Sequence, residues 1–323
     1  MELRSVGSSG LEVSRVGLGG YQLGPEPDEN PDVDRAVRVI ERSIECGVNW
    51  LDTSENYLAT RNESVIGSAL ERIDDGFLIA SKVAPGAALT GGGSGFRREQ
   101  VQQGCRDSLR RLGREHLDIY FLHLPDETGV PLEETWGAMA ELADRGLVRA
   151  IGLSNYLLED VERCHAERAV DVVQVGLNLI DYLDDRPYIA RCGELEIAVT
   201  IYEPVAGGIL GGKTLDQARA AWPGPWKESL WYQRVLGHGT GERSFAVVNG
   251  LRPVADKLGA TVAQVAIAWV LHQPGVTAAI AGSRDGSHME ENAGAAALDL
   301  SAVLDEIEAL IPLGPAFEVA PET

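Results

Sequence analysis

The chain has 323 residues, of which 44% are hydrophobic and 24% are charged, so it can bury a large core, and we expect one domain over residues 1–323. Its 28 basic and 49 acidic residues give a formal net charge of −21, which argues against nucleic acid or an anionic membrane surface as a partner. The N-terminus has no apolar core after its charges and no apolar run reaches membrane-spanning length, so we expect a cytoplasmic protein.

The cysteines and most histidines carry no metal or disulfide pattern. The four cysteines are widely spaced and form no Cys-x-x-Cys pair, and four of the six histidines lack ligand spacing. We therefore expect reduced thiols and no metal site. The residues concerned are Cys46, Cys105, Cys164, Cys192, His116, His165, His238 and His272.

The chain begins with a predicted hairpin and a first core strand. Residues 2–14 contain two short segments around Ser8-Ser9-Gly10, which predicts a β-hairpin that caps one end of the fold. Residues 15–20 form the first core strand, which ends in Gly19-Gly20, where a backbone can approach a ligand closely. The apolar spacing over residues 32–46 predicts the first helix.

The same strand and helix unit then repeats along the chain. We predict strands at 48–51, 77–82, 117–122, 148–153, 171–175, 196–202 and 276–281, and helices at 62–73, 97–112, 132–145, 157–167, 185–192, 243–258, 261–273, 287–297 and 301–310. Counted from residue 15 there are eight strands, each followed by at least one helix. This alternation predicts an α/β fold, a closed (β/α)8 TIM barrel with an N-terminal β-hairpin cap and extra helices near the C-terminus.

Charged side chains follow three of these strands. Asp52, Lys82 and His123 each come at the end of an apolar run, and ligands of α/β barrels lie at the carboxyl ends of the strands. Tyr57 follows Asp52 closely. An ammonium beside a phenol stabilises its phenolate, and a carboxylate keeps that ammonium charged, so Tyr57 can give a proton to a carbonyl oxygen while Lys82 and Asp52 tune it. His123 can hold the carbonyl by a hydrogen bond.

Motifs along nearly the whole chain, from about residue 3 to 310, resemble the aldo-keto reductases. They are Asn49 to Tyr57, Asn62 to Gly67, Ser81-Lys82, Phe121 to His123, Ile151 to Asn155, Gln174, and Tyr202-Glu203-Pro204 through Gly212-Lys213. The resemblance implies a (β/α)8 barrel that reduces an aldehyde or ketone with NADPH, with NADH as the alternative cofactor. It also implies that Tyr57 is the general acid, that Lys82 and Asp52 are its partners, and that His123 orients the carbonyl.

The same resemblance implies the cofactor contacts. Ser154, Asn155 and Gln174 would bind the carboxamide, and Tyr202 would stack on the nicotinamide ring. The full set of expected contacts is Gly20, Tyr21, Asp52, Ser154, Asn155, Gln174, Tyr202, Pro204, Gly207, Gly208, Leu210, Lys213, Gly282, Ser283, Arg284, His288, Glu291 and Asn292.

Two stretches depart from the pattern of the family. Leu58 stands where members often carry Gly, so the loop after Tyr57 is expected to differ. Gly282 and His288 stand where many members carry Lys and Arg, which leaves Ser283 and Arg284 as the expected contacts of a 2′-phosphate.

Two other functions compete with a reductase. Residues 207–214 fit Gly-x-x-x-x-Gly-Lys-Thr, the phosphate loop of nucleotide hydrolases, but Pro223 and Pro225 follow closely and no later strand ends in an acidic Mg²⁺ ligand. The second alternative is a reductase-like regulatory or binding subunit with slow turnover. The presence of all four candidate catalytic residues, Asp52, Tyr57, Lys82 and His123, argues against it.

The substrate is the least determined part of the prediction. Loops 85–95, 124–130 and 203–241 are expected to wall the pocket, and Tyr57, His123 and Trp226 are its expected contacts. Trp222, Trp231 and Tyr232 either add to an aromatic surface or pack the long loop onto the barrel. We expect a small-molecule carbonyl compound, apolar or cyclic, as the partner of a monomer or homo-oligomer.

Overall fold

A computed structural model describes residues 1–25, 30–73, 76–86, 93–181, 186–222 and 227–311. A two-stranded antiparallel sheet precedes eight parallel strands that close into a barrel. The strands are β1 (Leu3–Ser5), β2 (Glu12–Ser14), β3 (Val16–Gly19), β4 (Trp50–Asp52), β5 (Leu78–Val83), β6 (Leu117–Leu122), β7 (Val148–Ser154), β8 (Val172–Gly176), β9 (Ala198–Tyr202) and β10 (Val276–Gly282). Strand β10 pairs with both β9 and β3, which closes the ring and confirms the predicted (β/α)8 barrel.

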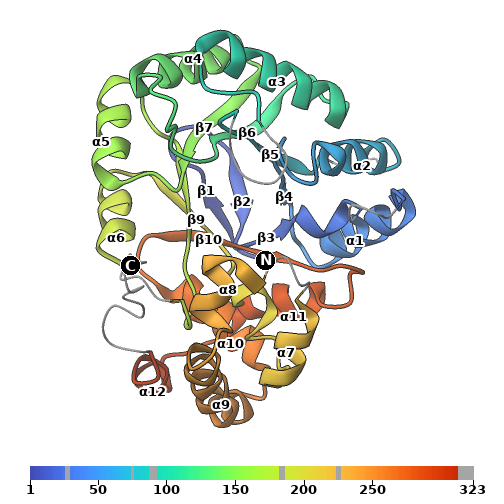
Figure 1. Ribbon diagram of the computed structural model, residues 1–323, viewed down its shortest axis with the longest axis vertical. Coiled ribbons are helices and arrows are strands. Elements are labelled where there is room, and N and C mark those ends of the chain that lie inside the picture. Colours follow the sequence, from blue (N-terminus) through green and yellow to red (C-terminus); the bar gives the residue numbers. More distant parts are fainter. Residues whose placement is uncertain (26–29, 74–75, 87–92, 182–185, 223–226, 312–323) are drawn as a thin grey trace.

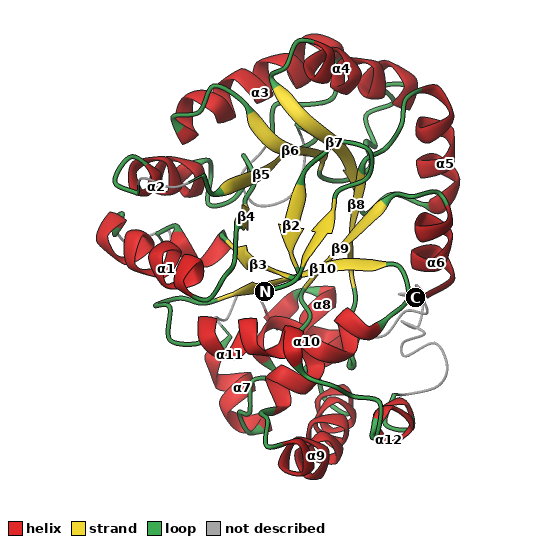
Figure 2. Cartoon of the chain, turned by 180° about the vertical axis from the view of Figure 1, so that it is seen from behind, coloured by secondary structure: helices red, strands yellow, loops and turns green. Residues whose placement is uncertain are grey.

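The helices surround the strands, as Figures 1 and 2 show. Their bounds are α1 (Val33–Glu45), α2 (Arg61–Leu70), α3 (Arg98–Leu112), α4 (Leu132–Asp144), α5 (Leu158–Glu167), α6 (Arg186–Glu194), α7 (Leu215–Ala221), α8 (Leu230–Val235), α9 (Thr240–Leu258), α10 (Val262–His272), α11 (Met289–Gly294) and α12 (Leu304–Glu308). Short 3₁₀ helices are η1 (Tyr21–Leu23), η2 (Ala206–Gly208) and η4 (Ala295–Ala297). Helices α7 and α8 lie in the stretch 203–241, where the sequence predicted none.

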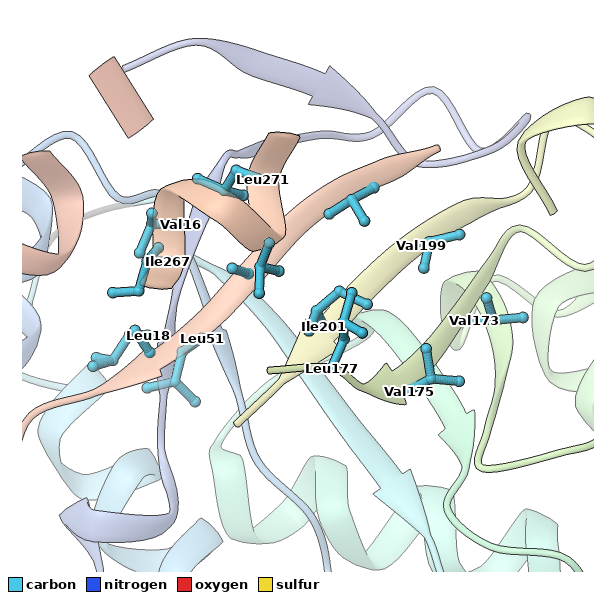
Figure 3. Packing of buried hydrophobic residues seen from close by; sticks show 14 of the residues in the cluster. Val16, Leu18, Leu51, Val173, Val175, Leu177, Val199, Ile201, Ile267 and Leu271 are labelled. Atoms are coloured by element: carbon cyan, nitrogen blue, oxygen red, sulfur yellow. The ribbon is translucent and has the colours of Figure 1, made fainter. Parts of the chain in front are cut away.

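The core has two layers because successive strand residues face opposite sides of the sheet. The larger cluster fills the space between strands and helices, and Figure 3 shows part of it, where Ile267 and Leu271 of α10 approach Val16 and Leu18 of β3. Inside the barrel Trp50 is fully buried, and a Cβ on Gly17 would lie 2.3 Å from its ring. Only glycine at residue 17 leaves room for that indole.

The hairpin closes one end of the barrel, as predicted. Val6, Leu11 and Val13 belong to the same buried cluster as the inward-facing strand residues, and Trp50 donates its Nε1 hydrogen to the Ser14 carbonyl at 3.0 Å. Figure 1 shows β1 and β2 within the ring of strands. The amino ends of the strands are therefore covered, and the carboxyl ends carry the polar residues described below.

No single helix among the described residues is long and apolar enough to cross a membrane. Helices α9 and α10 together reach the length and composition of a span but meet at 90°. Many of the apolar residues of this pair belong to the hydrophobic core, since α10 is buried along most of its length against the barrel.

Candidate active site

Two charged side chains and a phenol meet at the carboxyl ends of β4 and β5. Lys82 is fully buried, and its Nζ donates to Asp52 Oδ2 at 2.6 Å, to the Thr53 carbonyl at 2.8 Å and to Tyr57 OH at 3.2 Å. An ammonium has three hydrogens, so all of them are used. Because Tyr57 accepts a hydrogen bond from Lys82, its own phenolic hydrogen can point to a bound oxygen atom.

Burial and charge act against each other in this cluster. Burial alone would lower the pKa of Lys82, but Asp52 and Tyr57 outweigh it, so the pKa is raised and the lysine stays an ammonium. Burial raises the pKa of Tyr57 above its ordinary value of about 10, although Lys82 opposes this. Lys82 lowers the pKa of the phenol, as expected, but burial raises this pKa by more. Tyr57 is accordingly a phenol, not a phenolate, at neutral pH.

His123 follows β6 and lies beside Tyr57, with ring centroids 5.6 Å apart. Burial, assisted by the charge of Lys82, lowers its pKa to about 3, so the imidazole is neutral at physiological pH. Its Nδ1 lies 3.0 Å from Ser54 Oγ, and Ser54 Oγ lies 2.7 Å from Asn56 Oδ1. Ser54 and Asn56 belong to the motif Asn49 to Tyr57, but the sequence alone indicates no role for either.

One of the expected carboxamide contacts, Gln174, binds the same carboxylate, and the others lie close to Gln174 and His123. Gln174 Nε2 donates to the other oxygen of Asp52, Oδ1, at 2.8 Å, and Ser154 pairs with Gln174 in the register of β7 and β8. Asn155 donates its Nδ2 hydrogen to the His123 carbonyl at 3.1 Å and accepts a hydrogen bond from Tyr202 OH at 2.7 Å. The four residues therefore form one connected group with the catalytic candidates.

The backbone around the site is held by two further buried side chains that the sequence did not single out. Asn62 donates to the carbonyls of Gly20 and Tyr21, at 2.8 and 3.2 Å, and accepts from Thr53. Glu55 accepts from the backbone nitrogens of Ala84 and Ser94, at 2.9 and 2.8 Å. These contacts fix the loop that carries Tyr57 to the strands on either side. The signal in the sequence was polar residues in a short loop, which is typical of any turn.

The loop after Tyr57 has an unusual backbone conformation. Leu58, Ala59 and Thr60 have φ angles of 52°, 53° and 70°. Three successive non-glycine residues in the left-handed region are unfavourable, at about 1 kcal/mol or more each. The Leu58 side chain approaches Gly24, where an added Cβ would lie 2.6 Å from its Cδ1.

The remaining cofactor candidates lie in two groups on the same face of the barrel. The loop after β9 holds Pro204, Gly207, Gly208, Leu210 and Lys213, of which Lys213 is exposed and Leu210 is buried. This segment runs through η2 to the N-cap of α7. A phosphate loop joins a strand of an open sheet to its helix, so the closed barrel contradicts the nucleotide-hydrolase alternative.

The second group lies after β10 and in α11. Ser283 Oγ accepts from Gly286 N at 3.0 Å, Asn292 donates to the Gly282 carbonyl at 3.3 Å, and His288 Nδ1 lies 3.1 Å from Glu291 Oε2. Arg284 and His288 are both exposed. Two basic side chains are thus accessible at the end of β10.

The aromatic residues of the long loop pack on one another. The rings of Trp222 and Trp231 are 4.8 Å apart, and an added Cβ on Gly207 would contact both. Tyr232 is buried in the core. Trp226, the expected substrate contact, lies outside the described residues.

No group of three or more His, Cys, Asp or Glu residues in the described part of the chain is arranged to hold a metal ion. The four cysteines are unpaired thiols.

Comparisons with known proteins give a consistent result. The model of the aldo/keto reductase family matches residues 15–311. A probable aldo-keto reductase of Glycine max is 30% identical over 317 residues, which cover 96% of this chain and 88% of the relative. A rice protein described as a probable voltage-gated potassium channel subunit beta is 29% identical, with 98% of each chain covered. The solved structure of a glycerol dehydrogenase from Gluconobacter oxydans has a TM-score of 0.83 at 25% identity, with 98% of each chain covered.

Proposed function

Because the chain belongs to the aldo/keto reductase family, whose members use NAD(P)H, we propose that it reduces an aldehyde or ketone to an alcohol with NADPH. The observation that carries the proposal is the buried ion pair of Lys82 and Asp52, which holds the Tyr57 hydroxyl at 3.2 Å from an ammonium. A phenol in this position is a general acid next to a fixed positive charge. No covalent intermediate is required.

The residues divide the reaction between them. A bound nicotinamide cofactor would supply the hydride that reduces the carbonyl carbon. Tyr57 protonates the carbonyl oxygen, and the Lys82 ammonium stabilises the negative charge that develops on the phenolic oxygen as the proton leaves. His123 holds the carbonyl oxygen by a hydrogen bond. Ser154, Asn155 and Gln174 would hold the carboxamide, and Tyr202 would pack on the ring.

The preference for NADPH rests on the exposed basic residues after β10. Arg284 offers a planar guanidinium, which suits a 2′-phosphate, and His288 lies one helical turn before Asn292. A titration of tryptophan fluorescence with NADPH, NADH and ATP in parallel tests this. Tighter binding of NADPH supports the proposal, and a response to ATP alone contradicts it.

The role of Tyr57 is tested by Tyr57→Phe, which removes the transferable proton and leaves the ring. We expect turnover to fall by about 100-fold or more, while the affinity for NADPH is unchanged. Tyr120→Phe is a matched control, since that hydroxyl is buried with no hydrogen-bond partner among the described residues. Undiminished turnover in Tyr57→Phe would show that another group is the acid.

The name of the rice relative supports a second candidate, a regulatory subunit that binds NADPH and turns over slowly. A reductase and such a regulatory subunit share the same fold and differ in the rate of turnover. A panel of carbonyl compounds should include glyceraldehyde and dihydroxyacetone, because one structural neighbour is a glycerol dehydrogenase. Cofactor binding without turnover of any member of the panel would favour the regulatory role.

A further inference from the structure

Two buried polar residues are linked by hydrogen bonds to His123. Ser54 is fully buried and Asn56 is 8% exposed, and both lie on the loop between Asp52 and Tyr57. Ser54 Oγ contacts His123 Nδ1 at 3.0 Å on one side and Asn56 Oδ1 at 2.7 Å on the other. The three side chains form a chain of two hydrogen bonds that ends on the imidazole. The Lys82 carbonyl, at 3.4 Å from Ser54 Oγ, is a third and longer contact, so it is the weakest acceptor for the hydroxyl hydrogen.

Counting hydrogens shows that the two bonds depend on each other. An amide oxygen has no hydrogen, so the contact with Asn56 Oδ1 uses the only hydrogen of the Ser54 hydroxyl. The contact between Ser54 and His123 must then use a hydrogen of the ring. A neutral imidazole carries a single N–H, and in this arrangement it lies on Nδ1. The other ring nitrogen, Nε2, has a lone pair and cannot donate to a carbonyl oxygen.

Turning the Asn56 amide by 180° about χ2 reverses the chain. Asn56 then presents Nδ2 and donates to Ser54 Oγ, and Ser54 donates to His123 Nδ1. The ring loses its proton at Nδ1 and takes one up from solvent at Nε2, so its charge does not change. In this second arrangement Nε2–H is a donor, as the binding of a carbonyl oxygen requires.

We infer that Asn56, acting through Ser54, determines which nitrogen of His123 carries the hydrogen, and that reduction requires the arrangement in which Asn56 donates. Asn56 and Ser54 are positioning residues, because neither is placed to touch the substrate in our proposal. The inference rests on the proposed function, in which His123 holds the carbonyl oxygen.

Two substitutions at residue 56 force the two arrangements. In Asn56→Asp the new side chain has the same shape as asparagine, but its carboxylate can only accept hydrogen bonds. Ser54 therefore still donates its hydrogen to residue 56, the ring hydrogen of His123 stays on Nδ1, and Nε2 carries none. Asn56→Leu has a similar volume and no acceptor. Ser54 then donates to the nearer of its two remaining acceptors, His123 Nδ1 at 3.0 Å rather than the Lys82 carbonyl at 3.4 Å, and Nε2–H is retained. We expect kcat to fall by about 100-fold in Asn56→Asp and by less than about tenfold in Asn56→Leu. A purely structural role changes kcat without changing the tautomer of His123, so the tautomer of each variant is measured beside kcat.

Double variants identify Ser54 as the link. In Ser54→Ala the connection is broken, so adding Asn56→Asp or Asn56→Leu should produce the same kcat and the same tautomer as Ser54→Ala alone. Ser43→Ala serves as the control for losing a buried hydroxyl, because Ser43 Oγ donates within α1, to the Val39 carbonyl at 2.7 Å. We expect wild-type turnover from it.

The tautomer is read without turnover by ¹⁵N NMR of histidine-labelled protein at about pH 8, above the ordinary histidine pKa. The spectrum of His123→Gln identifies the signals of His123 among the six histidines. We expect Nδ1–H in the free wild type and in Asn56→Asp, and Nε2–H in Asn56→Leu. The same tautomer in both variants, or a larger loss of kcat in Asn56→Leu, would overturn the inference. Because the spectra need no substrate, failure to reduce any carbonyl would contradict the proposed function alone.

Discussion

Replacing Lys82 by methionine should reveal how much the fold depends on the catalytic ion pair. Methionine has nearly the length of lysine but no charge, so Asp52 would keep only the hydrogen bond from Gln174 on Oδ1. Asp52 is 4% exposed, and removing one partner of a buried pair typically costs about 3–5 kcal/mol because the remaining charge is unpaired. We expect a loss in the free energy of unfolding of about 4 kcal/mol.

This loss corresponds to a modest shift in the melting temperature. The entropy of unfolding is about 2.1 cal/mol/K per residue, which for 323 residues gives about 0.7 kcal/mol per degree, so Tm should fall by about 6 °C. Differential scanning calorimetry and urea unfolding both measure the change. Lys257→Met is the matched control, since its ion pair with Glu306 has the same 2.6 Å separation but is about half exposed. We expect less than about 1 kcal/mol there.

The double variant Lys82→Met with Asp52→Asn decides whether the unpaired charge is the cause. A neutral amide at residue 52 still accepts from Gln174, so the double variant should recover at least half of the lost stability even though it has no activity. If it is as unstable as Lys82→Met alone, the cost comes from packing around the methionine and the electrostatic reasoning is refuted.

Two further predictions concern the reaction. Because the pKa of Tyr57 lies above about 10 and that of His123 is about 3, neither group changes protonation between about pH 5 and pH 9, so kcat/KM for carbonyl reduction should be flat over that range. An inflection between pH 6 and about pH 7 that disappears in His123→Gln would contradict this assignment. Arg284→Ala should raise the KM for NADPH by about tenfold and leave that for NADH nearly unchanged, because in our proposal the guanidinium binds the 2′-phosphate, which NADH lacks. Equal effects on both cofactors would show that Arg284 does not select between them.

The fold followed from the sequence because its signals are local and repeated. Asp52, Lys82 and His123 each end an apolar run, and parallel strands bring such residues to one face of the barrel. The short helices α7 and α8 were missed because each has fewer than two turns of apolar pattern, in a stretch rich in Gly and Trp. The capping box of Thr214 and Gln217 was the available signal for α7.

The electrostatics of the site could not be predicted in the same way. From the sequence, the presence of Lys82 suggests that the pKa of Tyr57 is lowered. In the structure the pKa is raised, because Tyr57 is deeply buried, and no sequence pattern gives the depth of burial. Likewise, nothing in the sequence predicts that Leu58, Ala59 and Thr60 all adopt positive φ, because glycine is the residue that favours this conformation. Ser54 and Asn56 gain their significance only from their distances to His123.

The three hydrogen bonds of Lys82 have a consequence for chemical selectivity. Primary amines condense with aldehydes to form imines, and a pocket that receives carbonyl compounds beside a lysine would be open to self-inactivation. The reactive species is the neutral amine with its lone pair. Asp52, the Thr53 carbonyl and Tyr57 hold all three hydrogens of the ammonium, and the raised pKa keeps it protonated. The contacts that make Lys82 useful to the neighbouring phenol also prevent it from acting as a nucleophile toward the compounds that the protein handles.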